Sequence, residues 1–543
     1  MSYTSLNYLL YVAVCLIVYG IAPKKFRWVV LLAASMGFYA IVCMKYIGFV
    51  ILTAATTFAG GLGLEKYISV SDAYVKSQKG KWSKEEKNAY KDKATRNKKL
   101  ICAAVLVLNF GILAFLKYYN FFADSLNVIL KHFGGKIPNL GLFLPLGISF
   151  YTFQSMGYII DIYRKKYKAE CNPAKFLLFV SFFPQIVQGP ISFYSNLASQ
   201  LYEGNKLKFE NFKQGVLLIT WGFFKKLIIA DRLAQTVSTI PGEHRKYSGT
   251  VVLVTALIYA LQLYADFSGG IDISRGVAQL FGINMAENFK RPYFSKDISE
   301  YWHRWHITLG GWLREYLFYP VAMSKPFQKM GKNLKAKFGM KISKVVPVSI
   351  ASLITFIVVG VWHGANWKYV AFGVWNGGII MISTLLESNF ADWKKKLKIE
   401  NTNKLFITFQ VIRTFLIVLV GYYFDIAPGF KDAMHMMYVS VADFHVSELL
   451  TAGLFTDIMV AKREMLIVAV ATVTMLIVSI IQERCEKKND DTIPSSEKTL
   501  RAVICKKHFV FQSAIFLLLF FSVLVFGEYG PGSDPADFVY AQF

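Results

Sequence analysis

The sequence predicts an all-α protein that crosses a membrane many times. Of its 543 residues, 54% are hydrophobic and 16% are aromatic, and the mean hydropathy is +0.39. This is more apolar surface than a soluble core buries, and it comes in separate blocks of roughly 17 to 25 residues, the length a helix needs to cross about 30 Å of hydrocarbon. Because lipid offers the backbone no hydrogen bonds, such blocks fold as helices. We expect about 11 to 13 membrane segments, including re-entrant and interfacial ones.

The apolar blocks follow one another along the whole chain. Two of them are interrupted: Pro184 and Pro190 fall in the block near residue 176, and Lys225 and Lys226 fall in the block near 214. We detect no internal repeat and no Pro/Ser-rich linker, so residues 1–543 are expected to form one membrane-embedded domain. The blocks begin near residues 4, 28, 46, 100, 140, 176, 214, 250, 345, 366, 404, 464 and 508.

The basic residues that give the chain its net charge of +26 lie between the apolar blocks. Basic residues follow the first block at 24–27, eleven occupy residues 65–99, and four more lie at 164–168. By the positive-inside rule these connections are cytoplasmic and the N-terminus is outside. No base-reading motif accompanies the charge, which argues against a nucleic-acid partner. We therefore expect a multi-pass protein of the lipid bilayer with a basic cytoplasmic loop at 65–99.

Residues 264–320 are too polar to span a membrane and too aromatic for a solvent loop. Trp302, Trp305 and Trp312 alternate there with Arg304 and other basic residues, as in amphipathic helices at a membrane interface. Such a segment can line a cavity or serve only as an aromatic anchor. We treat residues 264–386 as the candidate catalytic segment.

A histidine stands inside the apolar run that follows, in the stretch VGVWHGANW (359–367). An intramembrane histidine is either a packing residue or a functional one. Gly360 and Gly364 flank His363 and Asn366 follows, so the helix can break there if the break lines a cavity. His303 and His306 lie three residues apart and permit a metal-ligand interpretation, but no third ligand is evident. The six cysteines are scattered, so we expect neither a disulfide framework nor a metal.

Five stretches of the sequence resemble the membrane-bound O-acyltransferase family, in particular its bacterial branch for alginate O-acetylation, which is related to the branch for D-alanyl transfer to teichoic acid. The resemblance implies a ring of helices around a central catalytic tunnel in the bacterial cytoplasmic membrane. It also implies a cytoplasmic entrance for an activated acyl donor. The stretches are PLGISFYTFQSMGYIIDIYR, FFPQIVQGPI, YADFSGGIDISRG (264–276), NFKRPYFSKDISEYWHRWHITLGGWLREYLFYP (288–320) and VGVWHGANWKYVAFGVWNG (359–377).

The resemblance places the family's catalytic histidine at His363 and its second polar position at His306. A neutral imidazole can take the proton of an acceptor hydroxyl as that hydroxyl attacks a thioester carbonyl. His306 would orient the acceptor or the thioester. Asn366, Trp367 and Trp305 are candidates for stabilising the oxyanion or positioning substrate, alongside a backbone N–H freed at the glycine break.

Three arginines are candidates for the phosphates of the acyl donor. Guanidinium groups match phosphate geometry, so Arg291, Arg304 and Arg314 could serve there. The alternative is that they anchor the protein to lipid head groups. We expect no bound cofactor; the donor would be acetyl-CoA, or alternatively an acylated carrier protein.

The C-terminal tail at 529–543 ends in FVYAQF, after a Gly/Pro-containing linker. This ending resembles the C-terminal motif of a small partner peptide of teichoic acid D-alanylation, whose tyrosine is proposed to carry the acyl group. By position that residue is Tyr540, which would make the phenol a covalent nucleophile. The alternative is a tail that only packs.

Three function classes remain open at this point. The first is acetyl transfer from a cytoplasmic thioester towards an extracellular or cell-wall polysaccharide. The resemblance implies that a separate extracytoplasmic SGNH-type transferase acts as partner, because the chain has no serine block of that type. The second is D-alanyl transfer to teichoic acid. The third is a transporter without acyl chemistry, which would more naturally show paired repeats.

Overall fold

The computed structural model describes residues 2–451, 453–487, 499–529 and 538. By their contacts the residues fall into two compact units, although the sequence was interpreted as one domain. Unit 1 comprises residues 1–212 and 277–286, and unit 2 comprises residues 213–276 and 287–543. The described residues form helices and an isolated bridge but no β-strand, which confirms the all-helical prediction.

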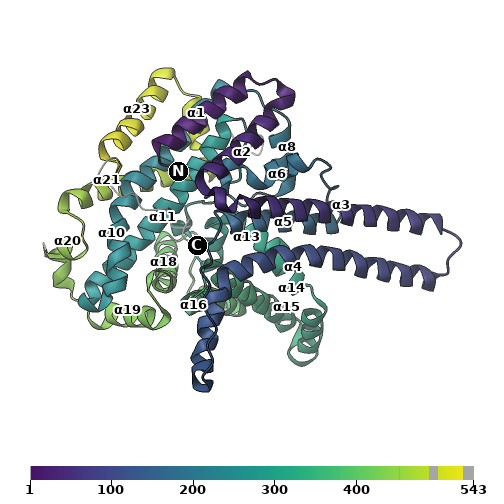
Figure 1. The fold of residues 1–543 in the computed structure, drawn as a ribbon. Helices are drawn as coiled ribbons and strands as arrows, with labels where there is room; N and C mark the ends of the chain where they lie inside the picture. Colours follow the sequence, from purple (N-terminus) through teal and green to yellow (C-terminus); the bar gives the residue numbers. More distant parts are fainter. Residues whose placement is uncertain (1, 452, 488–498, 530–537, 539–543) are drawn as a thin grey trace. The chain divides into compact units, whose positions relative to one another are not determined.

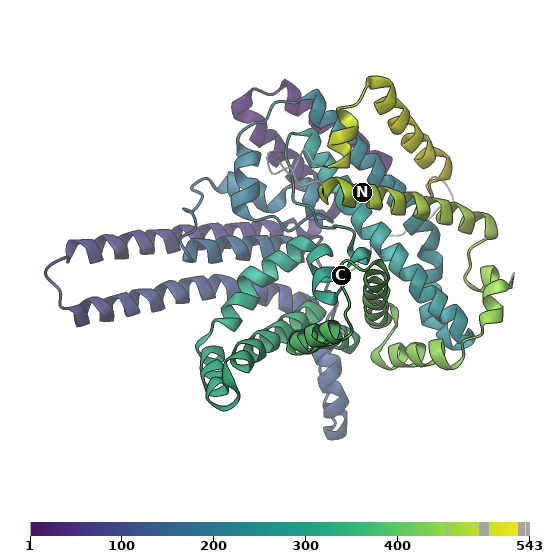
Figure 2. The same cartoon turned by 180° about the vertical axis from the view of Figure 1, so that it is seen from behind.

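Unit 1 is built from the first eight helices, and its most extended feature is the helical pair α3 and α4, which lie side by side in Figures 1 and 2. A capping box begins α4: the Ser83 hydroxyl accepts from the N–H of Glu86, and the Glu86 carboxylate accepts from the N–H of Ser83. The helices are α1 (Leu6–Ile21), α2 (Arg27–Cys43), α3 (Ile47–Ser77), α4 (Lys84–Leu130), α5 (Ile148–Tyr163), α6 (Pro173–Ser181), α7 (Phe183–Ile186) and α8 (Tyr194–Tyr202).

The basic segment at 65–99 is helical for most of its length rather than an irregular loop. Helix α3 continues to Ser77, and α4 begins at Lys84 after only six intervening residues. Its many lysines and alanines are good helix formers, and like charges on a solvated helix face are tolerated.

Unit 2 contains the longer and more varied set of helices. Helix α9 runs without a break through the π-helical segment η4 (Phe224–Ala230) into α10. The other helices are α9 (Phe209–Phe223), α10 (Asp231–Thr239), α11 (Gly249–Leu280), α12 (Ile298–Arg304), α13 (Ile307–Leu313), α14 (Tyr319–Ala322), α15 (Lys325–His363), α16 (Trp367–Leu385), α17 (Glu387–Lys396), α18 (Lys404–Ile426), α19 (Phe430–Ala442), α20 (Gly453–Asp457), α21 (Lys462–Lys487), α22 (Leu500–Cys505) and α23 (Phe509–Phe526).

The two lysines that interrupt the apolar block near residue 214 lie in η4 and are neutralised by carboxylates of α10 and α11. Lys226 is 1% exposed, and its Nζ lies 2.7 Å from Asp266 and 2.8 Å from Asp231. Lys225 Nζ lies 2.7 Å from Asp272. Burying a charge is costly unless it is paired, so α11, which carries Asp266 and Asp272, fixes the position of η4.

Fewer helices are long enough to span a membrane than the 11 to 13 membrane segments expected. Among the described residues, seven helical runs are long and apolar enough, or eight if the bent pair α16 and α17 is one span. The blocks near 28 and 46 fall in the single run Lys24–Ser77, and those near 4, 140 and 176 form helices of only 16, 16 and 9 residues. At 1.5 Å per residue, 16 residues reach about 24 Å, short of the hydrocarbon thickness.

Candidate active site

His363 is the last residue of α15, at a break between two antiparallel helices. Helix α15 ends at His363 and α16 begins at Trp367, which confirms the predicted break. The two helices pack closely because Gly360 and Gly364 lack side chains. A Cβ at Gly360 would lie 2.1 Å from the carbonyl oxygen of Tyr369, and one at Gly364 would lie 2.2 Å from its ring. The glycines therefore bring the His363 end of α15 against the first turn of α16.

His306 is held by a short backbone pairing that turns the chain between α12 and α13. Lys290 N donates to the carbonyl of Arg304 at 2.9 Å, Ile307 N donates to the carbonyl of Asn288 at 3.0 Å, and Phe289 pairs with Trp305 as an antiparallel bridge. His306 has φ +46°, a left-handed backbone that costs a non-glycine residue energy. Such strain persists only where the surrounding structure enforces it, and here the pairing does so.

Asn288 fixes which ring nitrogen of His306 carries the proton. The Oδ1 of Asn288 accepts from the backbone N–H of Thr308 at 3.0 Å and from its hydroxyl at 2.9 Å, and it lies 3.2 Å from Nδ1 of His306. A backbone N–H can only donate, so the side-chain atom facing it must be the amide oxygen. His306 Nδ1 must then donate to the same oxygen. The neutral imidazole therefore carries its hydrogen on Nδ1 and its lone pair on Nε2.

Aromatic side chains connect the two histidines. The ring of His306 lies 5.9 Å from that of Trp362 and 4.9 Å from that of Phe267, centroid to centroid. Trp362 in turn lies 5.2 Å from the ring of His363. His306 is 2% exposed and His363 is 5% exposed. Two imidazoles predicted from separate motifs are thus gathered around one indole.

Burial lowers the pKa of His306 to about 3, and the neighbouring imidazole of His363 lowers it further. Desolvation disfavours the charged form of a histidine, and a second histidine nearby adds repulsion when both are charged. His306 is therefore neutral at physiological pH.

A small cavity of about 10 Å³ lies beside His363. It is lined by Trp305, Phe372, Asn376 and Tyr422 among others. This volume is close to the minimum for one water molecule. Two residues at this cavity escaped the sequence interpretation: Asn376, whose Oδ1 accepts from Trp302 Nε1 at 3.3 Å, and Tyr422, whose hydroxyl lies 2.8 Å from that of Tyr301. The sequence signal that could have found both residues is a polar side chain one helical turn away from apolar ones.

The residues predicted to stabilise an oxyanion are placed differently from one another. Trp305 is 3% exposed and lines the cavity with His363. Asn366 is the N-cap of α16, and its Oδ1 accepts from the N–H of Lys368 at 3.0 Å. Trp367 is 61% exposed. The structure brings Trp305 to His363, while the roles of Asn366 and Trp367 stay predictions.

Two of the three candidate phosphate-binding arginines hold carboxylates of α21. Arg291 lies 2.7 Å from Glu483 and 2.6 Å from Glu486, and Arg304 lies 3.2 Å from the same Glu483. Arg314 is exposed. A phosphate at Arg291 or Arg304 would have to displace or share these carboxylates.

His303 is exposed, and its Nδ1 lies 2.7 Å from the carbonyl of Ser299. In the part of the chain that the structure describes, no group of three or more His, Cys, Asp or Glu side chains has metal-binding geometry. Tyr540, predicted as an acyl carrier, lies outside the described residues, whereas Phe538 two residues earlier is buried, and Lys226 Nζ lies 4.5 Å from its ring centroid.

Comparison with known proteins places this site in a family. The family model of membrane-bound O-acyltransferases matches residues 168–334, which include His306. The probable alginate O-acetylase of Azotobacter vinelandii is 31% identical over 459 residues, which are 83% of this chain and 80% of the relative. The chain belongs to the membrane-bound O-acyltransferase family. It is therefore a polytopic membrane enzyme that transfers acyl groups to oxygen, as the sequence predicted.

Other relatives of this O-acyltransferase have different acceptors in their names. The peptidoglycan O-acetyltransferase of Helicobacter pylori is 30% identical, over 64% of this chain and 62% of the relative. The teichoic acid D-alanyltransferase of Bacillus subtilis is 27% identical, over 56% of this chain and 73% of the relative. An O-acyltransferase of this family needs a base for the acceptor hydroxyl and a route for the acyl donor.

Proposed function

We propose that this O-acyltransferase moves an acetyl group from acetyl-CoA, across the bacterial cytoplasmic membrane, for the O-acetylation of an extracellular or cell-wall polysaccharide. The observation that carries the chemistry is the pair of buried histidines around Trp362, with the tautomer of His306 fixed by Asn288. Acetyl transfer is supported by relatives named for acetylating alginate and peptidoglycan.

His363 is the proposed general base. It takes the proton of the acceptor hydroxyl while the hydroxyl oxygen bonds to the thioester carbonyl carbon. The tetrahedral intermediate collapses as the carbon–sulfur bond breaks, and the thiolate of CoA takes the proton back from the imidazolium. Trp305 lines the cavity beside His363 and would position substrate there. Asn366 and Trp367 remain candidates for the oxyanion.

His306 is the proposed positioning residue. A base works best when its pKa is near the operating pH, and burial holds the pKa of His306 far below that, at about 3. A neutral ring with its lone pair on Nε2 can accept a hydrogen bond from the acceptor hydroxyl without removing its proton. The low pKa of His306 argues against that residue as the base and leaves the role to His363.

The donor's phosphates are proposed to bind at the arginines. Arg314 is the exposed one, so its guanidinium is accessible to a soluble donor without breaking an ion pair. Arg291 and Arg304 would bind a phosphate only if it displaced or shared the carboxylates that they hold. An acylated carrier protein is the alternative donor, and D-alanyl the alternative acyl group, because a teichoic acid D-alanyltransferase is among the relatives.

Two further proposals concern topology and partner. Residues 65–99 would face the cytoplasm and the N-terminus the outside, on the distribution of basic residues. An epitope tag inserted after Gly80 should be reached by antibody only in permeabilised cells; labelling of intact cells would reverse the proposed direction of acyl flow. A separate SGNH-type transferase would place the acetyl group on the sugar.

The deciding experiment supplies acetyl-labelled CoA to membranes that contain the chain and measures free CoA and polymer-bound acetyl. We expect His363→Ala to lower transfer roughly 10²- to 10⁴-fold, with the protein still inserted. His303→Ala, which removes an exposed imidazole, is the matched control and should be active. Transfer from a D-alanylated carrier but not from acetyl-CoA would favour the alternative donor. Normal transfer by His363→Ala would refute the site.

A further inference from the structure

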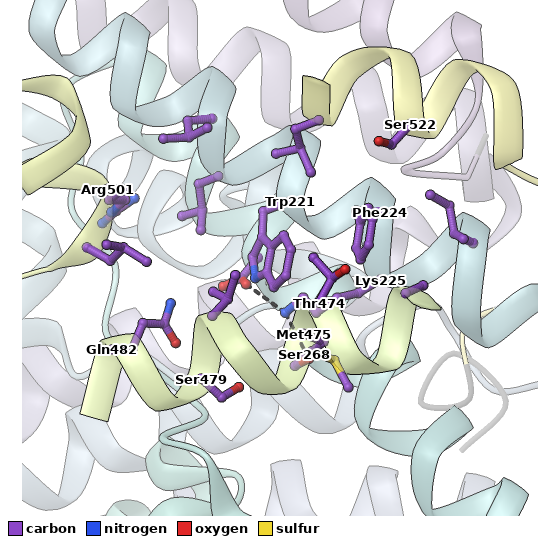
Figure 3. A pocket seen from close by; sticks show the side chains of 18 of the residues that line it. Trp221, Phe224, Lys225, Ser268, Thr474, Met475, Ser479, Gln482, Arg501 and Ser522 are labelled. Carbon is purple, nitrogen blue, oxygen red and sulfur yellow. Dashed lines mark hydrogen bonds and ion pairs between the residues drawn. The ribbon is translucent and has the colours of Figure 1, made fainter. Parts of the chain in front are cut away.

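A second, much larger cavity lies inside unit 2, away from both histidines. It has a volume of about 660 Å³ and is bounded by α9 with η4, α11, α21, α22 and α23 (Figure 3). This volume lies within the range of roughly 300 to 1,000 Å³ that is typical of ligand sites. Neither His306 nor His363 lines it, so it is not the proposed catalytic site, although Arg291, a candidate for the donor's phosphates, is among its lining residues.

The cavity extends along nearly the whole of α21. Its lining residues on that helix run from Leu466 to Glu486. At 1.5 Å per residue these positions are about 30 Å apart, which matches the hydrocarbon thickness of a bilayer. The cavity is therefore as long as a lipid leaflet or more, rather than a compact pocket for a small polar ligand.

The two ends of the cavity differ in polarity. Leu466, Ile467 and Phe526 line one end, and Gln482 and Arg501 line the other. In Figure 3 Arg501 and Gln482 lie together at one end, and Phe224 and Ser522 lie towards the other. A ligand with an apolar chain and a polar head matches this change along the axis.

The apolar end opens towards lipid. Leu466 and Val470 of α21 and Leu518 of α23 line the cavity and are also exposed at the surface. Both helices are among the runs long and apolar enough to cross the membrane. Exposed apolar side chains on such helices face hydrocarbon, so a molecule already in the bilayer can enter between them.

The lining of the cavity carries one more basic than acidic side chain. Four basic and three acidic side chains line the cavity. Lys225 lies 2.7 Å from Asp272, Arg275 lies 3.5 Å from Asp272 and 3.2 Å from Glu287, and Arg291 lies 2.6 Å from Glu486. Arg501 is the fourth cation, and the charges of Asp272 and Glu287 act on it as well.

Arg501 stands close to a second guanidinium. Burial, and then the positive charge of Arg275, lower the pKa of Arg501 to about 10. Arg275 and Arg501 both line the cavity, so two partly buried guanidinium groups face the same space. The Nε of Arg275 is buried without a hydrogen-bond partner among the described residues. Two such cations side by side are complementary to a phosphate group.

We propose that this cavity binds one anionic phospholipid of the surrounding bilayer, with an acyl chain along α21 and the phosphate at Arg501 and Arg275. The binding is separate from acyl transfer at the histidines and does not depend on it. Charge complementarity at one end and the opening to hydrocarbon at the other favour a membrane lipid over a soluble phosphate.

The test measures lipid retained by the full chain after exchange into an excess of detergent. Extraction and mass spectrometry should find about one phospholipid per chain, and reloading should favour vesicles of phosphatidylcholine with phosphatidylglycerol over phosphatidylcholine alone. Arg501→Gln should lower retention about tenfold, the effect of losing one charge-assisted hydrogen bond. Ser522→Trp, which fills the apolar end, should lower it similarly.

Two controls match these variants. Arg484→Gln removes an exposed arginine of α21 that does not line the cavity, and Val525→Trp adds an indole to an exposed position of α23. Both should retain lipid as the wild type does. A wild-type chain without lipid, equal retention by Arg501→Gln and Arg484→Gln, or binding of inorganic phosphate alone would overturn the proposal. If Ser522→Trp does not fold, the Arg501→Gln comparison decides.

Discussion

The side-chain oxygen of Asn288 accepts hydrogen bonds from the backbone of Thr308 and from Nδ1 of His306, 3.2 Å away. One asparagine thus ties the start of α13 to the tautomer of a buried imidazole. Two substitutions of Asn288 can therefore separate a catalytic effect from a structural one.

Asn288→Ala should lower transfer roughly ten- to a hundredfold, because losing one buried hydrogen-bond acceptor costs about 1 to 3 kcal/mol. Without that acceptor, the proton of His306 is no longer held on Nδ1. Asn288→Asp keeps an acceptor for Thr308 and should preserve folding, while its charge raises the pKa of His306. Nitrogen NMR of the imidazole would report both effects. Unchanged tautomer and activity in Asn288→Ala would contradict the positioning role.

The stability of the protein should fall as the pH drops below about 6.5. The folded state holds the pKa of His306 at about 3, whereas an unfolded histidine takes up a proton near 6.5. The unfolded state therefore binds more protons in the window from 6.5 to 3, and at pH 5 His306 alone costs about 2 kcal/mol. His306→Gln should show a shallower loss of Tm than wild type, and His303→Gln should not. Equal slopes in all three proteins would show that His306 does not titrate this way.

Gly360→Ala should destabilise the protein, because its Cβ would lie 2.1 Å from a backbone oxygen of the neighbouring helix. Overpacking of this kind costs about 1 to 3 kcal/mol and would separate α15 from α16, displacing His363. Gly378→Ala is the control on α16, since a Cβ there meets nothing within 4 Å. Thermal unfolding in detergent should rank Gly378→Ala at or above wild type and Gly360→Ala below it; the reverse order would reject the close packing.

Arg314→Gln and Arg291→Gln should have different effects. Arg314 is exposed, so its loss should raise KM for the thioester donor and leave Tm unchanged. Arg291 holds two carboxylates, so its loss removes the ion pair of Glu486 and leaves Glu483 with Arg304 alone, which should lower Tm. Donor titrations and unfolding curves on the same preparations provide the comparison. An unaltered KM in Arg314→Gln would remove that residue from the donor site.

Tyr540→Phe should stop acylation of the polymer if the phenol carries the acyl group, because the ring stays and only the oxygen is lost. Tyr529→Phe removes a phenol oxygen from the same end of the chain and should remain active. Mass spectrometry of the wild-type C-terminal peptide should then find an ester on Tyr540. Full activity of Tyr540→Phe would assign the tail a packing role.

Features caused by neighbouring residues could be predicted from the sequence, whereas features caused by contacts between residues far apart in the chain could not. The break after His363 was readable because its cause, two flanking glycines, is local. The Asn288 contact was not, since it depends on a backbone pairing across 18 residues. The Arg291–Glu483 contact joins residues 192 apart, so no local pattern in the sequence reveals it. Likewise Lys225 and Lys226 looked like interruptions of a span, because Asp272 and Asp266, which pair with them from α11, lie 47 and 40 residues away.

The paired helices α3 and α4 also matter for how this enzyme can be imaged. At 1.5 Å per residue, the 31 residues of α3 are about 46 Å long, roughly 15 Å more than the hydrocarbon of a bilayer. The hairpin turn includes Gly80, whose φ is +85° and which has no neighbouring atoms within 4 Å of an added Cβ. A small rigid domain fused at this turn would stand clear of a detergent micelle, giving electron cryomicroscopy an alignment mark on a chain with seven helical runs long and apolar enough to span a membrane among its described residues.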